Sequence, residues 1–329
     1  MKSTNTSSTE AIDLTVHGRY NGRFCHSRVT ADGSERASVA LNKPQILWFN
    51  TGTLCNIECH NCYIKSSPTN DSLVYMTTAE VKNFLEQIKE RNWPISEIGL
   101  TGGEPFMNPD ILGIMRSILS EGYDLLILTN AMRPMMRPHI RKGLIEIINT
   151  YQHQLVVRVS LDHYQGEKHD EIRGDGAFER TLMGLDWLSQ HRFNIAVAGR
   201  MHWAEDENEV RRGFGALFHE RLYNIDPHDH SSLVLFPEMD LDMEIPEISV
   251  GCWKILDKSP NQMMCASSRM VVKRKFAPKP TVVSCTLLPY EPEFELGETL
   301  EEAESPVYLN HPYCAQFCVL GQASCSPKS

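Results

Sequence analysis

The stretch ILWFNTGTLCNIECHNC, residues 46–62, decides the fold expected for this chain. Its first four residues, 46–49, form an apolar run that predicts a buried β-strand. Three cysteines, Cys55, Cys59 and Cys62, follow in the loop directly after that strand. Their short spacings let one loop place three thiolates around a single inorganic centre.

Downstream of this strand, apolar runs alternate with amphipathic segments. The predicted strands are 46–49, 98–100, 125–128, 155–161, 194–199 and 232–236, and the predicted helices are 78–91, 110–121, 138–149, 177–190 and 205–221. Strands that are apolar on both faces and separated by helices imply a parallel sheet covered by helices. Such a sheet is either open and doubly wound or part of a (β/α) barrel.

The pattern changes after Pro237, where an acidic, irregular stretch begins. A β-hairpin is predicted over 265–290 and a short helix over 297–304, before a cysteine-rich tail. We therefore expect three parts. They are an N-terminal extension (1–43), the main α/β domain (44–240) and a C-terminal region (241–329).

Two kinds of inorganic centre compete for the cysteine loop. A structural zinc site needs a fourth thiolate or imidazole, and His60 is the nearest local candidate. A [4Fe–4S] cluster with three protein ligands leaves one iron open to bind a small molecule. The spacing favours the cluster over zinc.

This cysteine spacing, together with its context, resembles the signature of the radical S-adenosylmethionine (SAM) superfamily. A GGEP motif of that family corresponds here to Gly102, Gly103, Glu104 and Pro105, at the end of the second predicted strand. The resemblance implies an α/β fold, namely a partial (β/α)6 TIM-like barrel. It also implies that backbone groups of the motif hold the amino end of SAM, although the same residues could simply form a turn.

Further polar residues follow the later strands, and the resemblance implies that they contact SAM. These candidates are Asn130, Ser160, Asp162, Arg173 and Arg200. Each of them could instead be an ordinary helix cap or turn former. Apart from Arg173, which lies in the segment 169–176, every candidate lies at the carboxyl end of a predicted strand, where α/β proteins assemble their sites.

The sequence departs from the family pattern at one position. Many members carry an aromatic residue just before the third cysteine, but Asn61 stands there and Tyr63 follows the cysteine. We therefore expect Tyr63 to contribute to the SAM pocket.

A second set of cysteines gathers towards the end of the chain. It consists of Cys265, Cys285, Cys314, Cys318 and Cys325. Their order resembles the Twitch or SPASM extension of radical SAM enzymes, which implies one auxiliary [4Fe–4S] cluster. A zinc site is the alternative, because four thiolates satisfy zinc equally well.

The charge and the apolar content of the chain argue against nucleic acids and membranes as its partners. The net charge is −10, and the only basic run, Lys273-Arg274-Lys275, is too short for a nucleic-acid footprint. No apolar stretch reaches the length of a membrane span, and residues 1–20 lack the apolar core of a signal peptide. We expect a cytoplasmic protein in which ten cysteines serve metal binding or catalysis.

The resemblance implies reductive cleavage of SAM, with electrons from a donor such as flavodoxin or ferredoxin. About 45 residues precede the first strand, which is short for a peptide-binding domain, so a small-molecule substrate is expected. A weaker likeness, to the radical SAM enzymes of arsinothricin biosynthesis, implies transfer of a 3-amino-3-carboxypropyl group to arsenite. Alternatives are a SPASM-type peptide-modifying enzyme, a cluster-bearing SAM-binding protein without turnover, and a zinc-stabilised α/β protein.

Overall fold

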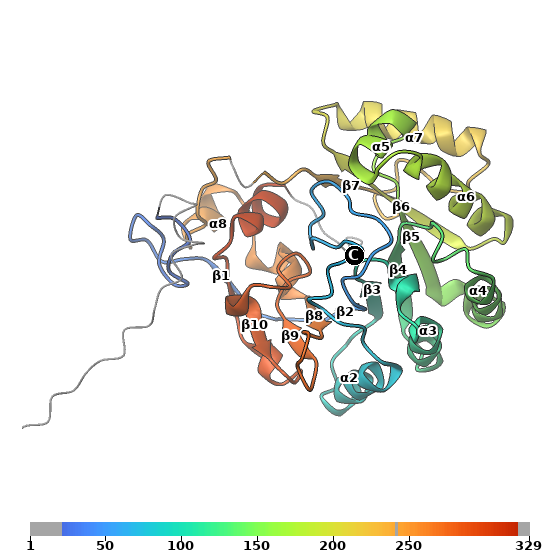
Figure 1. Cartoon of the computed structure of the whole chain (residues 1–329). Coiled ribbons are helices and arrows are strands. Elements are labelled where there is room, and N and C mark those ends of the chain that lie inside the picture. Colours follow the sequence, from blue (N-terminus) through green and yellow to red (C-terminus); the bar gives the residue numbers. More distant parts are fainter. Residues whose placement is uncertain (1–21, 241–242, 322–329) are drawn as a thin grey trace, which may run out of the picture.

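The computed structural model describes residues 22–240 and 243–321 of the chain. Its centre is a sheet with the strand order β10-β9-β8-β2-β3-β4-β5-β6-β7 (Figure 1). The strands β2 to β7 run parallel to one another, as the sequence predicts. They are β2 (Ile46–Asn50), β3 (Glu97–Thr101), β4 (Asp124–Thr129), β5 (Leu155–Ser160), β6 (Asn194–Met201) and β7 (Leu233–Pro237).

Helices connect these strands and cover the outer face of the sheet (Figure 1). They are α2 (Thr78–Glu90), α3 (Ile111–Ser120), α4 (Pro138–Tyr151), α5 (Gly166–Arg173), α6 (Ala177–Gln190) and α7 (Glu207–Glu220). Short 3₁₀ turns are η2 (Pro105–Met107), η3 (Gln152–Gln154), η4 (Pro260–Gln262), η5 (Met264–Ala266), η6 (Pro292–Phe294) and η7 (Glu302–Glu304). The architecture is therefore α/β, with one mostly parallel sheet.

Helix α2 illustrates why these segments are helical. Thr77 and Glu80 form a reciprocal capping box that satisfies free backbone N–H groups at its start. Its buried residues recur with helical spacing and are Val81, Phe84, Leu85 and Ile88. The Phe84 ring meets Phe49 of β2 edge-on, with ring centroids 6.1 Å apart. The helix is thereby fixed against the sheet.

The C-terminal region continues the central sheet. Strand β8 (Ser268–Val272) pairs with β2 in parallel, and β9 (Thr281–Val283) returns antiparallel to it. Strand β10 (Glu295–Gly297) then pairs with β9. The predicted hairpin is confirmed, and it joins the same sheet as the parallel strands.

The helix predicted over 297–304 is wrong. Gly297 has a φ of +130°, which a helix does not accommodate. The Glu302 carboxylate accepts from the N–H groups of Glu298 and Thr299, at 2.8 and 3.0 Å. This local turn leaves only the short 3₁₀ segment η7.

Several elements were not predicted. Helix α5 and the short α8 (Cys252–Ile255) are two of them. At the other end, β1 (Ser38–Val39) pairs with β11 (Val307–Tyr308), so the N-terminal segment joins the C-terminal region. Residues 1–21, which belong to the predicted N-terminal extension, lie outside the described residues.

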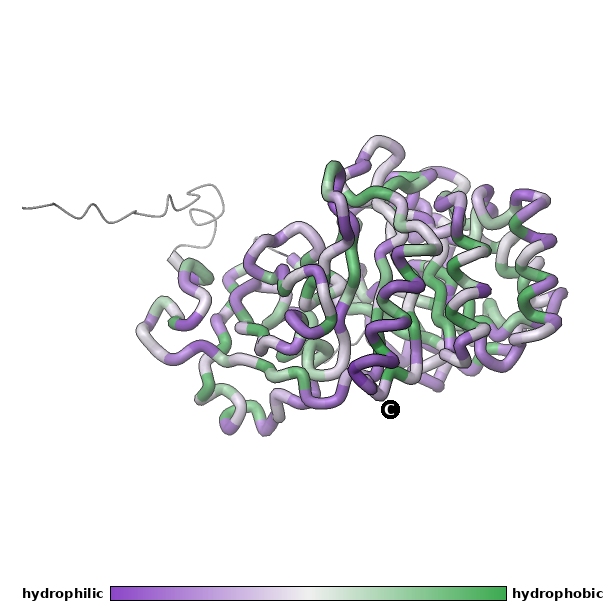
Figure 2. Tube along the Cα trace, turned by 90° about the horizontal axis from the view of Figure 1, so that it is seen from below, coloured by the Kyte–Doolittle hydropathy of each residue, from purple (hydrophilic) through white to green (hydrophobic). Residues whose placement is uncertain are grey.

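Successive side chains of β2 point to opposite faces of the sheet, and the core has one layer on each face. Leu47 and Phe49 pack with the helices, whereas Trp48 packs with the C-terminal region on the other face. Figure 2 shows hydrophobic residues along the strands and alternating character along the helices. Among the described residues, no helix has both the length and the apolar character needed to cross a membrane.

Candidate functional site

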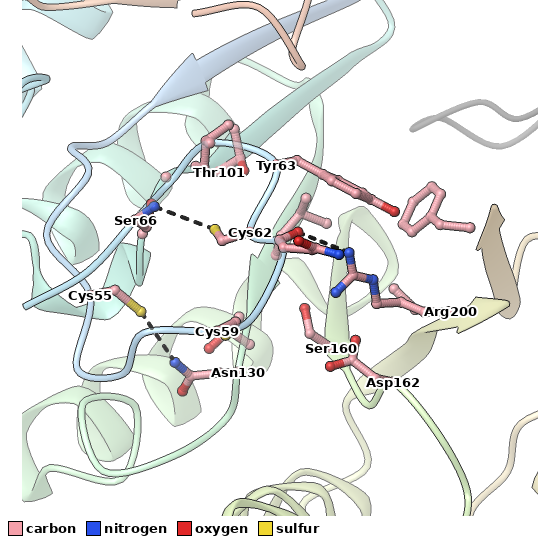
Figure 3. Close-up of a pocket in the computed structure, with 18 of the residues that line it drawn as sticks. Cys55, Cys59, Cys62, Tyr63, Ser66, Thr101, Asn130, Ser160, Asp162 and Arg200 are labelled. Atoms are coloured by element: carbon pink, nitrogen blue, oxygen red, sulfur yellow. Dashed lines mark hydrogen bonds between the residues drawn. The ribbon is translucent and has the colours of Figure 1, made fainter. Parts of the chain in front are cut away.

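The cysteines Cys55, Cys59 and Cys62 lie on the loop after β2, at the edge where the parallel strands end (Figure 3). All three line one pocket, which encloses about 1130 Å³ of empty space including its open mouth. The ends of the neighbouring parallel strands form much of its wall, and Thr286 and Leu287 close it from the C-terminal region. This is the edge at which α/β proteins bind their ligands.

Two glycines let the end of β3 run against the cysteine loop. A Cβ atom on Gly103 would lie 2.3 Å from the carbonyl oxygen of Leu54, and one on Gly102 would lie 2.5 Å from that of Gly52. Gly102 also has a φ of +147°. The N–H of Gly103 donates to Gly52 O at 2.8 Å. The close approach that requires glycine is therefore to the loop backbone, and both glycines also line the pocket.

Cys55 is buried, and Cys59 and Cys62 are partly buried. Burial raises the pKa of Cys55 to about 12 and also raises the pKa of Cys59. The Asn130 side-chain N–H₂ lies 3.9 Å from Cys55 Sγ, and the Ser66 N–H donates to Cys62 Sγ at 3.4 Å (Figure 3). Because thiolates are the metal-binding form, ionising these thiols requires positive charge close by.

The buried side chain of Glu104 holds strand ends next to the pocket together. Its carboxylate accepts from the Thr129 hydroxyl at 2.9 Å, from the Asn130 N–H at 2.9 Å and from the Phe106 N–H at 3.1 Å. Complete burial raises the pKa of Glu104 to about 7, against the opposing effect of these donors. The side chain ties the end of β3 to the end of β4, and neither Glu104 nor Pro105 is among the residues that line the pocket.

Two charged side chains of the site pair with each other. Arg173 donates to Asp162 through Nε at 2.5 Å and through Nη2 at 3.1 Å. Burial alone would raise the pKa of Asp162, but the adjacent guanidinium holds it below its usual range. Both side chains line the pocket, so they present a neutral, polar pair beside the cysteines.

Arg200, on β6, binds the backbone of the cysteine loop. Its guanidinium donates to the carbonyl oxygens of His60 and Asn61, at 3.1 and 2.9 Å. It also lies over the Tyr63 ring, 4.9 Å from the centroid. Tyr63 in turn donates its hydroxyl to Pro237 O at 3.1 Å, and burial raises its pKa to about 12.

The second set of cysteines packs in the C-terminal region. Cys265 lies on η5, Cys285 follows β9, and Cys314 and Cys318 lie on a π-helical segment, Cys314–Leu320. Cys265 is a buried member of one hydrophobic cluster, and the other three cysteines are partly buried and pack against it. Burial raises the pKa of Cys314 well above its ordinary value, with further contributions from Cys285 and Cys265. Cys325, also predicted as a ligand, lies outside the described residues.

This second set adjoins the main pocket. Thr286 and Leu287, which directly follow Cys285, line the pocket, and the Leu287 N–H donates to Cys285 Sγ at 3.4 Å. Tyr290 donates its hydroxyl to Ile64 O at 2.8 Å, next to the first set of cysteines. The segment that begins at Cys285 thus contacts both the pocket and the loop that carries the first set. Within the described residues, no three side chains of His, Cys, Asp or Glu are arranged to hold a single metal ion.

The family model of the radical SAM superfamily matches residues 49–210. These residues form a radical SAM domain. The matched range begins in β2 and ends in α7, so it includes the cysteine loop and the GGEP motif. Proteins of this superfamily are iron–sulfur enzymes that use a [4Fe–4S] cluster and SAM.

Two curated relatives share this domain. The subtilosin biosynthesis protein AlbA of Bacillus subtilis (strain 168) is 29% identical over 177 residues, which cover 54% of this chain and 36% of AlbA. The AdoMet-dependent heme synthase of Methanosarcina barkeri (strain Fusaro / DSM 804) is 30% identical over 159 residues, which cover 47% of this chain and 42% of the synthase. The chain therefore spans well under half the length of these relatives.

Solved structures show the same fold. SuiB of Streptococcus suis, bound to its precursor peptide SuiA, matches with a TM-score of 0.58 and 12% identity, over 81% of this chain and 66% of SuiB. The protein anSMEcpe with bound AdoMet matches with a TM-score of 0.53 and 15% identity, over 79% of this chain and 77% of that protein. The expected TIM-like partial barrel of the radical SAM enzymes is thereby confirmed.

The residues of the radical SAM domain fit its two cofactors. The first cysteine set brings three thiols to one pocket, which is the number of protein ligands of a cluster with one open iron. Trp48 Nε1, Ser66 Oγ and Arg200 Nε belong to pocket-lining residues and are buried without a hydrogen-bond partner in the described structure. Asn130 and Ser160, both predicted as SAM contacts, also line the pocket.

Sequence reasoning missed part of the pocket wall. Trp48, Leu128, Phe236, Thr286 and Leu287 line the pocket, but none of them was singled out beforehand. Alternation along β2 could have placed Trp48 on the face opposite Leu47. No local signal brings residues 286 and 287 to this edge, because their position depends on the pairing of β8 with β2.

Proposed function

We propose that this chain is an enzyme that reductively cleaves SAM at a [4Fe–4S] cluster held by Cys55, Cys59 and Cys62. The observation that carries the proposal is the convergence of three thiols from one loop on a single pocket of a radical SAM domain. Three ligands leave one iron of such a cluster open, and SAM can bind there.

The bound, reduced cluster supplies the electron that breaks a carbon–sulfur bond of SAM. The chain positions the reactants and excludes water. Arg200 and Tyr63 hold the cysteine loop in place, and the Asp162–Arg173 pair offers polar contacts beside it. The proposed electron donor is a flavodoxin or a ferredoxin, and the high cysteine content suits the reducing cytoplasm.

The second cysteine set is proposed to hold one auxiliary [4Fe–4S] cluster. Its ligands are Cys265, Cys285 and one or two of Cys314, Cys318 and Cys325. Support comes from the packing of the described members around one cluster of side chains, with Cys265 buried and the other three partly buried. The SPASM-type relative AlbA supports it as well.

For the substrate, we favour a small molecule, and arsenite is the specific hypothesis. The reaction would transfer the 3-amino-3-carboxypropyl group of SAM to arsenic and release methylthioadenosine. Soft thiolates bind soft elements well. Cys285 directly precedes two pocket-lining residues, so thiol chemistry lies next to the pocket.

A peptide substrate is the second candidate. AlbA is named for bacteriocin biosynthesis, and it shares the domain with this chain.

The test is SAM cleavage by anaerobically purified protein, reconstituted with iron and sulfide and supplied with a strong reductant. The control is a variant in which Cys55, Cys59 and Cys62 are changed to Ala. Release of 5′-deoxyadenosine, lost in the variant, would support hydrogen-abstracting chemistry. Release of methylthioadenosine, with a carbon–arsenic product when arsenite is added, would support aminocarboxypropyl transfer.

Two other outcomes would contradict parts of the proposal. If iron-loaded protein binds SAM but releases no nucleoside with any added substrate, the chain is a cluster-bearing SAM-binding protein. Zinc in place of iron in the purified protein would remove the basis of the proposed function.

A further inference from the structure

One arginine is buried behind the second cysteine set without a carboxylate partner. Arg269, on β8, is only 1% exposed. Its guanidinium donates to four carbonyl oxygens. They belong to Ala303 at 2.8 Å, Cys265 at 2.6 Å, Ser268 at 2.9 Å and Ser305 at 3.3 Å. In the described part of the chain, no Asp or Glu oxygen lies within 4.0 Å of it.

Comparable arginines of this chain are paired differently. Arg36, Arg173 and Arg211 are also buried or nearly so, and each lies within 2.8 Å of a carboxylate oxygen. Carbonyl oxygens satisfy the N–H groups of Arg269, but they do not neutralise its charge. A buried cation without a counter-ion is costly, so a negative group is expected close to it.

The cysteines of the second set are the groups in position to carry that charge. Arg269 Nη1 donates to the carbonyl oxygen of Cys265 at 2.6 Å, which places the guanidinium beside this cysteine. Burial lowers the pKa of Arg269, and Cys265 and Cys285 act against that effect. Once thiolates bind an iron–sulfur cluster, the complex is negative overall, and it gains one further negative charge on reduction.

We propose that Arg269 is the counter-charge of the auxiliary cluster and raises the reduction potential of that cluster. The inference rests on the auxiliary cluster of the proposed function. A fixed positive charge stabilises the reduced, more negative state more than the oxidised state, so reduction becomes easier. Arg269 is then a positioning and tuning residue that touches no substrate.

The position of Arg269 suits a fixed charge. It lies opposite Leu47 in the register of β8 with β2, and β8 is hydrogen-bonded to a neighbouring strand on each side. Its four carbonyl partners come from two separate segments of the C-terminal region. Two lie in the segment 265–268, and two are residues 303 and 305. The guanidinium is therefore held rigidly, and its field at the cysteines does not relax when the cluster is reduced.

The test is a redox titration of the auxiliary cluster alone. Changing Cys55, Cys59 and Cys62 to Ala removes the first cluster and leaves the second set intact. In this background, R269Q removes the charge and R269K keeps it, and the reduced cluster is followed by electron paramagnetic resonance. The matched control is R274Q, which removes a partly exposed arginine that pairs with Glu295.

We expect R269Q to shift the potential to a more negative value, while R269K and R274Q stay close to the background protein. Loss of iron in R269Q but not in R269K would also support the counter-charge. Equal potentials in R269Q and the background, or equal loss of iron in R269Q and R269K, would overturn it. If the background protein itself binds no iron, the auxiliary cluster is absent and the inference fails with it, whereas SAM cleavage by the unmodified chain tests the first cluster separately.

Discussion

Gly103 lies where the backbone of the cysteine loop passes closest to the end of β3. Its missing side chain leaves room for the carbonyl oxygens of Leu54 and Thr53, which would lie 2.3 and 2.6 Å from a Cβ atom. These are backbone atoms, so they cannot move aside without moving the loop. The residue therefore determines where the first cysteine set lies.

Changing Gly103 to Ala should displace the loop and lower the iron content of the first site. We expect the free energy of unfolding to fall by about 1–3 kcal/mol, as for other insertions into a packed site. Gly251→Ala is the control, because a Cβ there meets only Ser249 Oγ at 3.7 Å. Iron analysis and urea unfolding of both variants measure the effect, and equal iron content would contradict it.

At the same scale, His169 makes the free energy of unfolding depend on pH. It is fully buried, its Nδ1 accepts from the Asp162 N–H at 3.1 Å, and burial lowers its pKa to about 4. The unfolded chain has the ordinary pKa of about 6.5, so between these values the unfolded state binds more protons. The stabilising contribution is complete above pH 6.5 and is lost as the pH falls towards 4.

In iron-free protein, the free energy of unfolding should therefore fall more between pH 7 and pH 4.5 than in His169→Gln. The difference can reach about 3 kcal/mol, from 1.36 kcal/mol for each pH unit. Parallel urea titrations at several pH values measure it. Identical slopes for the two proteins would show that His169 does not titrate in this way.

The sequence predicted the cysteine loop and the strand-end candidates because each is a local pattern. It did not predict how the side chains use one another. Glu104 is bound to Thr129 and Asn130, and Asp162 is bound to Arg173. Those pairings depend on the distance between strand ends, which no local spacing specifies.

At the scale of elements, predictions succeeded where burial imposes a period. Helices α2 and α6 carry regular apolar faces, and both were predicted within one residue of their observed ends. Helix α5 was missed because its sequence, GEKHDEIR, buries only His169 and Ile172. Two buried positions in eight residues give too little periodicity to identify a helix.

The Tyr290 hydroxyl links the C-terminal region to the cysteine loop by a hydrogen bond. A phenylalanine at this position removes the hydroxyl and keeps the ring. Tyr290→Phe deletes the bond to Ile64 O and the bond that the hydroxyl accepts from Asn70 Nδ2 at 3.3 Å, with an expected loss of about 1–2 kcal/mol in the free energy of unfolding. We also expect faster loss of iron from the first site to a chelator, because the loop is less constrained. Tyr151→Phe is the control, since no hydrogen bond of the Tyr151 hydroxyl occurs among the described residues.

If both Tyr variants release iron at the rate of the unmodified chain, the C-terminal region does not restrain the loop. If Tyr290→Phe alone is faster, this contact couples the two cysteine sets. The comparison separates the two cases because both changes remove one hydroxyl group.

At the scale of the whole molecule, the central sheet contains strands from both sides of the expected boundary near residue 240. Strand β8 covers the edge of β2, where Leu47 and Trp48 are fully buried. We predict that a fragment of residues 1–240 aggregates, because it exposes an apolar sheet edge. Size-exclusion chromatography against the full chain measures this outcome. A monomeric fragment with native-like circular dichroism would contradict it.

The pairing of β2 with β8 has a further consequence for how the chain is made. More than two hundred residues separate Leu47 from Arg269, which lie opposite each other in the register. During synthesis, β2 and its three thiols emerge long before the strand that completes their side of the sheet. Contacts so distant in sequence form slowly, since a long loop must close first. The thiols therefore stay accessible through most of translation, and cluster insertion can precede the final closure of the sheet.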